Sequence, residues 1–489
     1  MALNTPNYSG NAYARSQGVY LPHPVDDDAK ARRDAPTQAL RFRRGWMILP
    51  AIVLPLLASL VGFALKKPAV NPLPAPPVEE VTRGRILAAD GTVLAEGMSA
   101  ARFYPQGSMA APLLGFTGAI QPDGRYGLEG MEYRLDATLQ AGHDVRLTLD
   151  PVLQSAAERH LADSAITHSA ESGAAVVLEV GTGRILAAAS YPTYDPNEWQ
   201  TADRSQMVNR AFQQVYEPGS VVKPMVVAGL LEDGLLSPDE LIDAPMTLRV
   251  GTKTFRDVAW HEPVLSVEDV LAYSSNSAMI FLGQRFEPAH LHDWLWRFGI
   301  GRELDLDSAF VRSGILNPWH RWVPQDQAAN SLGQNLSLTP LQLAAAYSIF
   351  ANDGVYVPPV LTEGEEVPEP HRVLSPEVAQ GVRSMMVHVM ENSGLRNSIL
   401  PGVSVAGKTG TADVYDDVTG TYPPDDYALT FAGMFPAEAP EVVMVVMLMK
   451  PDPDSTSTYV AAPIFRAIGS EIVAHWGQQP QAPALASGH

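Results

Sequence analysis

The chain contains no cysteine, and this absence excludes several kinds of chemistry. Without thiols there is no disulfide, no thiolate zinc site and no cysteine nucleophile. The 12 histidines do not form the H-E-x-x-H pattern of zinc hydrolases, and the nearest pair, His290 and His292, fits ordinary surface or core histidines. Basic residues are also scarce, with 34 lysines and arginines against 54 acidic residues. No basic block interleaved with aromatic residues is present, so nucleic acid is not expected as a partner.

One long hydrophobic run is present, at residues 45–65. It carries no charge, and a helix of this length rises at 1.5 Å per residue across roughly the 30 Å of a bilayer core. Pro50 and Pro55 would distort this helix, which membrane-buried helices tolerate. A cleaved signal peptide is the alternative, but its apolar core is usually only about 7 to 15 residues long. Arginines crowd the N-terminal side of the run. We therefore expect a single-pass protein of the cytoplasmic membrane, with the N-terminus inside and the larger part outside, in the periplasm or on the cell-wall side.

Composition divides the rest of the chain into further segments. Residues 1–44 are polar and without a period, as expected for a disordered cytoplasmic tail. Residues 66–82 form a proline-rich stalk. Residues 83–165 are predicted to be a first exported domain and residues 166–476 a second one. Residues 477–489 are predicted to be a disordered tail.

The second domain is predicted to be an α+β fold, with a mixed sheet flanked by helices. Its predicted segments are a strand hairpin at 174–189, a mostly helical stretch at 218–395, strands at about 403–413, 428–435 and 441–449, and a helix at about 459–476. The first domain is predicted to begin with two short strands around an Asp90-Gly91 turn and to end with a helix at about 151–163.

Three short motifs follow one another along the chain: Ser220-Val221-Val222-Lys223, Ser274-Ser275-Asn276 and Lys408-Thr409-Gly410-Thr411. With 31 serines and 7 lysines, an S-x-x-K string is expected by chance about half a time, so a single match means little. The ordered triple is a much stronger signal. Together the motifs supply a serine nucleophile, candidate bases, an amide and a glycine-containing strand. These parts suffice for acyl transfer without histidine or metal.

Ser220 is predicted to lie at the N-terminus of a helix, because Pro218-Gly219 stops an extended segment and an apolar helical period follows. Ser220 and Lys223 are three residues apart and therefore project from one side of this helix. The positive end of the helix favours a serine alkoxide and disfavours an ammonium. A desolvated lysine can then accept the serine proton. For this motif alone, a helix-capping serine beside a solvated lysine is the alternative.

The second and third motifs are predicted to lie on a turn and on a strand. Ser274-Ser275-Asn276 follows a short helix that begins with a capping box at Ser266, so a hydroxyl and an amide can face a cleft. Residues 405–411 are typical of a strand, and the glycine inside it indicates close approach by another backbone or a ligand. Lys408 offers a cation for a substrate carboxylate, and the strand edge can offer an oxyanion-hole amide. Taken alone, these segments also fit a polar helix cap and an ordinary edge strand.

With these motifs in place, the chain resembles a class B penicillin-binding protein, a monofunctional peptidoglycan D,D-transpeptidase of the division-specific type. The resemblance covers residues 83–476. Residues 83–86 resemble the start of the family's pedestal domain, Gly127-Leu128-Glu129 its later signature, and residues 333–342 the segment that leads into a family helix. Only a short segment separates Leu94 from Phe103, so the head subdomain common in the family is small or missing here.

The resemblance implies the penicillin-binding transpeptidase fold, with a pedestal at residues 83–165 and one transmembrane helix. It implies that a D-Ala-D-Ala donor acylates Ser220 and that Lys223 is the base. Ser274 and Asn276 would assist proton transfer and hold the donor amide. The backbone amides of Ser220 and Thr411 would form the oxyanion hole. The implied substrate-binding residues are Lys408, Thr409, Gly410 and Thr411, and no cofactor or metal is implied.

The resemblance also implies partners. These are peptidoglycan stem peptides, β-lactams as covalent inhibitors, and a SEDS-family glycan polymerase with other membrane proteins of the division machinery. The alternatives are an elongation-type transpeptidase, a non-catalytic division scaffold, or a β-lactam sensor with the same fold. The intact motifs argue against a scaffold, and the short N-terminal tail argues against a sensor. A β-lactamase would need neither an anchor nor a pedestal.

Overall fold

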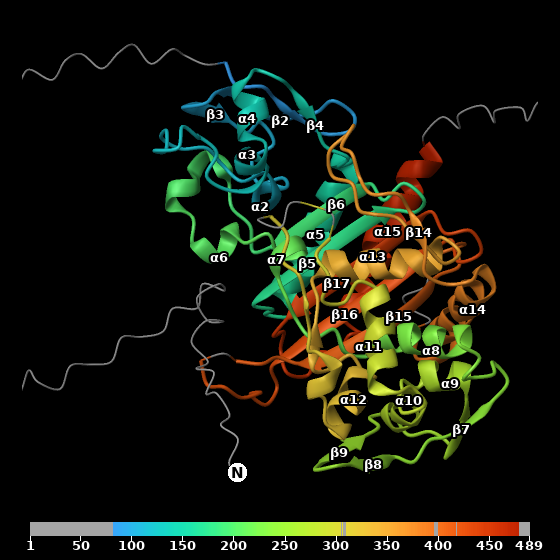
Figure 1. Cartoon of the computed structure of the whole chain (residues 1–489). Coiled ribbons are helices and arrows are strands. Elements are labelled where there is room, and N and C mark those ends of the chain that lie inside the picture. The colour runs from blue at the N-terminus through green and yellow to red at the C-terminus, as the bar shows by residue number, and fades with distance from the viewer. Residues whose placement is uncertain (1–81, 305, 307–309, 396–399, 417, 479–489) are drawn as a thin grey trace, which may run out of the picture. The chain divides into compact units, whose positions relative to one another are not determined.

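A five-stranded sheet forms the centre of the larger domain (Figure 1). The computed structural model describes residues 82–304, 306, 310–395, 400–416 and 418–478. The strand order is β15 (Ala406–Asp413), β16 (Tyr427–Phe435), β17 (Val442–Met449), β5 (Ser172–Glu179) and β6 (Ile185–Tyr191). The predicted strands at both ends of the domain are confirmed. The prediction of a mixed sheet is wrong in strand direction, because all four pairings are antiparallel. The short turns that join β5 to β6 and β16 to β17 allow only antiparallel neighbours.

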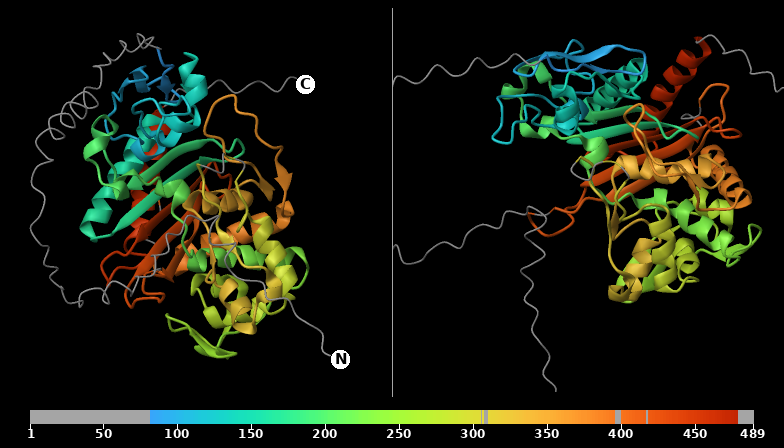
Figure 2. Two further views of the ribbon diagram at one scale, coloured as in Figure 1. Left: turned by 60° about the vertical axis from the view of Figure 1, so that its left-hand side comes forward. Right: turned by 45° about the horizontal axis from the view of Figure 1, so that its top comes forward.

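Helices cover both faces of the sheet (Figure 2). α5 (Pro151–Thr167) and α15 (Ala461–Gln478) pack together on one face, and α13 (Pro340–Ala351) packs against the other. All residues of α13 are buried, as expected for a helix that is apolar all round. The central strand β17 is also buried along its whole length, which explains its unbroken apolar sequence. The predicted α+β layer fold is therefore confirmed.

The segment between the two halves of the sheet is largely helical, as predicted, but it also contains short strand pairs. Its longer helices are α8 (Lys223–Glu232), α9 (Val267–Ala272), α10 (Asn276–Gly283), α11 (Pro288–Arg297), α12 (Pro324–Asn330) and α14 (Pro376–Asn392). The pairs are β7 (Leu241–Asp243) with β10 (Val264–Ser266), β8 (Thr247–Val250) with β9 (Lys253–Arg256), β11 (Ile315–Leu316) with β12 (Leu336–Ser337), and β13 (Val355–Tyr356) with β14 (His371–Arg372). Such short strands show no clear alternation, so the sequence did not indicate them.

The smaller N-terminal domain contains a four-stranded sheet of order β3-β2-β1-β4. Its elements are β1 (Ile86–Leu87), β2 (Val93–Met98), β3 (Ala101–Phe103) and β4 (Val145–Arg146), with helices α2 (Ala111–Leu114), α3 (Gly130–Arg134) and α4 (Asp136–Gln140). β1 and β2 pair antiparallel, and Asp90 Oδ1 accepts a hydrogen bond from the Thr92 N–H at 2.8 Å in the turn between them. The predicted hairpin is confirmed.

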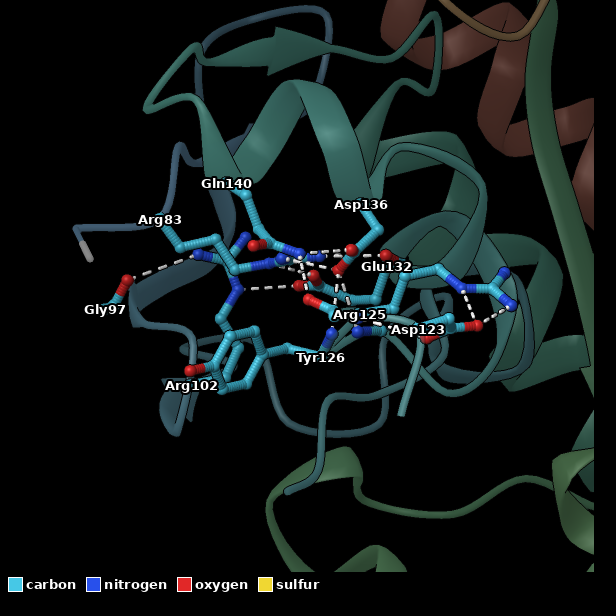
Figure 3. A network of polar contacts seen from close by, with 11 residues as sticks. Arg83, Gly97, Arg102, Asp123, Arg125, Tyr126, Glu132, Asp136 and Gln140 are labelled. Carbon is cyan, nitrogen blue, oxygen red and sulfur yellow. Dashed lines mark hydrogen bonds and ion pairs between the residues drawn. The ribbon is translucent and has the colours of Figure 1, made fainter. Parts of the chain in front are cut away.

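Arg83 lies at the centre of a buried polar network in this domain (Figure 3). It donates through Nε to Glu132 Oε2 and through Nη1 to Asp136 Oδ1, both at 2.8 Å. Arg102 Nε donates to the other Glu132 oxygen at 2.6 Å, and the Gly127 N–H donates to Asp136 Oδ1 at 2.8 Å. All four charged side chains are at most 3% exposed. The network therefore joins the two sequence stretches, around Arg83 and Gly127, that carry the pedestal resemblance.

Hydrogen bonds join the two predicted exported domains. The Tyr104 N–H donates to Asn197 Oδ1 at 3.0 Å, and the Thr148 hydroxyl donates to the Val360 carbonyl at 2.9 Å. The helix predicted at the end of the first domain is confirmed as α5, and it packs against β6 and α15 of the larger domain. The domain boundaries themselves stay a prediction.

The predicted membrane helix at residues 45–65 lies outside the described residues, together with the predicted tail at 1–44 and the stalk as far as residue 81. In the part of the chain that the structure does describe, no helix is both long enough and apolar enough to cross a bilayer.

Candidate active site

Ser220 lies in a single 3-10 turn, Gly219–Val222, directly before α8 begins at Lys223. Gly219 has a φ of +63°, and a Cβ there would lie 2.7 Å from the Thr411 carbonyl oxygen. This turn therefore needs glycine for its backbone conformation and for its close approach to β15. The predicted position of Ser220 at the start of a helix is confirmed.

Two other segments approach the Ser220 turn closely, each at a glycine. A Cβ on Gly410 would lie 2.4 Å from the Pro218 carbonyl oxygen, so the close approach predicted at this glycine is confirmed. On another side, a Cβ on Gly333 would lie 2.0 Å from the Gly219 carbonyl oxygen. The Gly219 N–H also donates to the Gly333 carbonyl at 3.0 Å. These contacts bring the third motif beside Ser220, although the two are far apart in sequence.

Lys223 is fully buried, and its amine is held by the second motif. Nζ donates to the Ser274 carbonyl at 2.6 Å, to Ser274 Oγ at 3.2 Å and to Asn276 Oδ1 at 2.8 Å. Burial lowers the pKa of Lys223 well below its ordinary value, and Lys408 lowers it further, while Asp257 acts in the opposite direction. Among the described residues Ser220 is not an acceptor of this amine, so Ser220 and Lys223 adjoin without a mutual hydrogen bond.

Ser274 occupies the turn between α9 and α10, as predicted. Its φ of +56° is unusual for a residue with a side chain. The following Ser275 caps α10 by accepting a hydrogen bond from the Ala278 N–H at 3.1 Å. Asn276 begins α10, and its Nδ2 donates to the Arg256 carbonyl at 2.8 Å while Oδ1 accepts from Lys223. The Asn276 amide is therefore oriented by partners on both sides.

Lys408 reaches the same serine from β15. Its Nζ lies 3.1 Å from Ser274 Oγ and donates to the Thr409 carbonyl at 3.1 Å. Burial lowers the pKa of Lys408 to about 7. Thr409 is half-buried and Thr411 is exposed on the same strand. Four predicted residues, Lys223, Ser274, Asn276 and Lys408, are thus joined by hydrogen bonds.

The sequence analysis missed Asp257, whose buried carboxylate holds the second motif in place through hydrogen bonds. Its carboxylate accepts hydrogen bonds from the Ser275 hydroxyl at 2.6 Å, the Asn276 N–H at 2.6 Å and the Ser277 hydroxyl at 3.0 Å. His261 Nε2 lies 2.8 Å from the same carboxylate, and both side chains are at most 1% exposed. Burial alone would raise the pKa of Asp257, but the hydrogen bonds from Ser275, His261 and the backbone outweigh it and lower the pKa. No local pattern in the sequence marks this residue.

Ser457 was also missed, although it lies against the third motif. Its hydroxyl is 2.9 Å from Thr411 Oγ1 and also bonds the Gly410 carbonyl. Ser457 precedes α15 and is buried. It therefore fixes the Thr411 side chain at the edge of the site.

Comparison with known proteins agrees with this geometry. Residues 173–470 match the family model described as the penicillin binding protein transpeptidase domain. The chain is 34% identical over 423 residues to the penicillin-binding protein PbpB of Mycolicibacterium smegmatis, which covers 76% of this chain and 64% of that protein. It is 32% identical over 411 residues to the peptidoglycan D,D-transpeptidase FtsI of Escherichia coli, which covers 78% of this chain and 68% of that protein. The chain thus spans less than two thirds of the length of PbpB.

A solved structure is similar over nearly all of its own length. Penicillin-binding protein 3 of Mycobacterium tuberculosis has a TM-score of 0.74 and 32% identity to this chain, covering 83% of this chain and 98% of that one. All three motifs lie inside the matched range of residues 173–470. This chain therefore belongs to the penicillin-binding proteins that carry a transpeptidase domain.

Proposed function

We propose that the protein is a peptidoglycan D,D-transpeptidase that crosslinks stem peptides through a serine acyl-enzyme. The observation that carries this proposal is the environment of Lys223, a fully buried amine whose hydrogen-bond acceptors are all uncharged oxygens. A lysine in such a site is stable as a neutral amine and can accept a proton from serine. The position of Ser220 at the same turn makes it the nucleophile.

The reaction then has two acyl-transfer steps. Ser220 Oγ attacks the carbonyl between the last two D-Ala residues of the donor, its proton passes to Lys223, and the terminal D-Ala leaves with a proton on its amine. The Ser274 hydroxyl, which lies within hydrogen-bond distance of Lys223, offers a path for that proton. An acceptor amine next attacks the ester and restores the Ser220 hydroxyl, so that the crosslink replaces the lost peptide bond. Asn276 holds the donor amide.

The third motif binds the C-terminal end of the donor peptide. Lys408, as a cation, pairs with the terminal carboxylate, and the Thr409 and Thr411 hydroxyls add hydrogen bonds. Gly410 lets this strand approach the Ser220 turn. The backbone amides of Ser220 and Thr411 form the oxyanion hole, which stabilises the tetrahedral intermediate where negative charge develops.

β-lactams are proposed as covalent inhibitors of the same serine. Penicillin-binding protein 3 of Mycobacterium tuberculosis has been solved in complex with ampicillin and with aztreonam. A β-lactam ring is a cyclic amide with a nearby acidic group, so it can occupy the donor site. Attack by Ser220 opens the ring, and the leaving amine stays attached to the acyl group.

The cellular role is proposed to be septal wall synthesis at the cytoplasmic membrane. The chain would comprise a cytoplasmic tail (1–44), a transmembrane helix (45–65), a stalk (66–82), a pedestal (83–165) and a transpeptidase domain (166–476). A transpeptidase domain crosslinks glycan that a polymerase has made, so it must meet new glycan, and we propose a SEDS-family polymerase partner that contacts the membrane helix and pedestal. The pedestal sequence supports a division role over an elongation role.

The proposal is tested with the full-length protein, a donor peptide ending in D-Ala-D-Ala and an acceptor peptide without that end. We expect release of D-Ala and formation of the crosslinked dimer, both blocked by penicillin. Ser220→Ala should lose both activities. A protein that forms no acyl-enzyme and releases no D-Ala would be a scaffold, and a fluorescent fusion confined to the side wall would contradict the septal role.

A further inference from the structure

A cavity of about 230 Å³ is lined in part by close chain neighbours of the candidate site residues. Its lining includes Glu217, Lys253, Gln334, Asn335, Asp413 and Tyr422. Glu217 lies three residues before Ser220, and three residues of chain span at most about 11 Å. Asp413 lies two residues beyond Thr411, at the end of β15. A substrate held between Ser220 and Thr411 can therefore reach into this cavity.

Glu217 is a carboxylate that has no cation at hydrogen-bond distance among the residues that the structure describes. Its Oε1 accepts from the Tyr422 hydroxyl at 3.0 Å and from the Asn335 N–H at 3.1 Å. Burial raises the pKa of Glu217, although Tyr422, Asn335 and the more distant Lys253 act against this rise, and Asp413 adds to it. A partly desolvated carboxylate of this kind gains from a ligand that brings a positive charge and N–H donors.

Lys253 supplies the opposite charge in the lining of the same cavity. Its Nζ lies 3.4 Å from Gln334 Oε1, a long contact with a neutral acceptor, and it forms no salt bridge with any residue that the structure describes. Asp326, which also lines the cavity, is already engaged, because its carboxylate accepts a backbone N–H at the start of α12 at 2.9 Å. The described lining thus holds three carboxylates, Glu217, Asp326 and Asp413, and one ammonium, Lys253, and none of these groups forms a salt bridge with a residue that the structure describes.

We propose that this cavity is an acceptor subsite for a zwitterionic amino-acid head group, with the ligand's ammonium on Glu217 and its carboxylate on Lys253. The inference rests on the proposed transpeptidase function and names the chemical class of side chain that the acceptor stem peptide carries. A side chain ending in both charges satisfies both residues, whereas a simple alkyl ammonium satisfies Glu217 alone. The cavity is smaller than the roughly 300 to 1,000 Å³ of pockets for drug-sized ligands, so it suits one side chain.

The test compares two acceptor tripeptides that differ only in the third residue. One carries diaminopimelic acid with its free amino-acid head group, and the other carries lysine. Binding of each labelled peptide to the full-length protein is measured by fluorescence anisotropy, before and after saturation with penicillin. We expect the wild type to bind the diaminopimelate peptide about tenfold more tightly, because its carboxylate gains a charge-assisted hydrogen bond.

Lys253→Met should abolish this preference. Glu217→Gln should weaken the binding of both peptides. Arg249→Met is the matched control, because Arg249 is an exposed cation on the paired strand β8 and does not line the cavity. This control should keep the preference. Equal affinities in the wild type, no measurable binding of either peptide, or an unchanged preference in Lys253→Met would overturn the subsite. Labelling by fluorescent penicillin reports separately on the proposed function, so its failure is distinguishable from failure of the subsite.

Discussion

Lys223 and Lys408 share one hydrogen-bond partner, because their amines lie 3.2 Å and 3.1 Å from Ser274 Oγ. Both side chains are at most 1% exposed, and two ammonium ions this close in a buried site repel each other strongly. Among the described residues, no carboxylate forms a salt bridge with either lysine. The arrangement therefore favours one neutral and one protonated amine. We assign the neutral base to Lys223, since burial and the Lys408 charge both lower its pKa.

The second-order rate constant for acylation by penicillin should show a bell-shaped dependence on pH. Its rising limb follows deprotonation of Lys223, whose pKa lies well below the ordinary lysine value. Its falling limb follows deprotonation of Lys408, whose pKa is about 7, because the neutral amine no longer pairs with the carboxylate of penicillin. Stopped-flow acylation between about pH 5 and pH 9 reports these groups in the free enzyme. Lys408→Arg, which stays charged, should lose the falling limb. A wild-type rate that climbs steadily through this range would contradict the assignment of Lys408.

Replacing Asp257 should move the rising limb of that profile. Asp257 is the group that raises the pKa of Lys223, so Asp257→Asn should shift the limb to lower pH. The variant also loses charge-assisted hydrogen bonds from Ser275 and Asn276, which should lower the free energy of unfolding by about 1.5 to 3 kcal/mol. A destabilised variant with an unshifted pH profile would show that Asp257 only supports the fold.

The buried polar network around Arg83 predicts different outcomes for two neighbouring arginines. Arg83→Met leaves Glu132 and Asp136 short of a buried partner and should lower the free energy of unfolding by about 3 to 5 kcal/mol. Arg85→Met is the matched control, because it removes only an exposed pair with Asp144 and should leave stability nearly unchanged. Denaturant unfolding of the full-length variants measures both. Equal stabilities for the two variants would show that the buried network contributes little.

The parts of the site that could be predicted are those with a local signal. Ser220 follows a Pro-Gly break and opens an apolar helical period, and Gly410 interrupts a strand where nothing in the strand itself requires glycine. The predicted helix start at Ser266 is confirmed by the hydrogen bond that Ser266 Oγ accepts from the Asp269 N–H at 3.2 Å, and it located the turn that carries Ser274. The reciprocal bond of a capping box is replaced by one from the Ser266 hydroxyl to Asp269 Oδ2 at 2.8 Å. Each of these signals arises within a few residues, so each was readable without the fold.

The parts that escaped prediction depend on contacts between distant segments. Asp257 acquires its role only because the loop after β9 lies beneath the start of α10, and nothing near it in sequence indicates this. The Glu217 cavity likewise needs β9, α12 and the end of β15 to meet. The direction of the β17–β5 pairing was missed for a similar reason, because these strands are far apart in sequence. The hydrophobic pattern of β17 marks burial on both faces but not the direction of such a distant neighbour.

The central claim is that Ser220 forms the acyl-enzyme and that Lys223 takes its proton as a neutral amine. The most direct test is the rate of penicilloyl adduct formation in Lys223→Arg, followed by intact mass and mapped by peptide digestion, with Ser220→Ala as the blank. Arginine keeps the charge but cannot deprotonate. We predict one adduct, on the Ser220 peptide of the wild type, and acylation of Lys223→Arg slower by about 100-fold to 10,000-fold with an unchanged thermal melt. Acylation of Lys223→Arg at close to the wild-type rate would contradict the account and place the base elsewhere, with Ser274 as the first candidate.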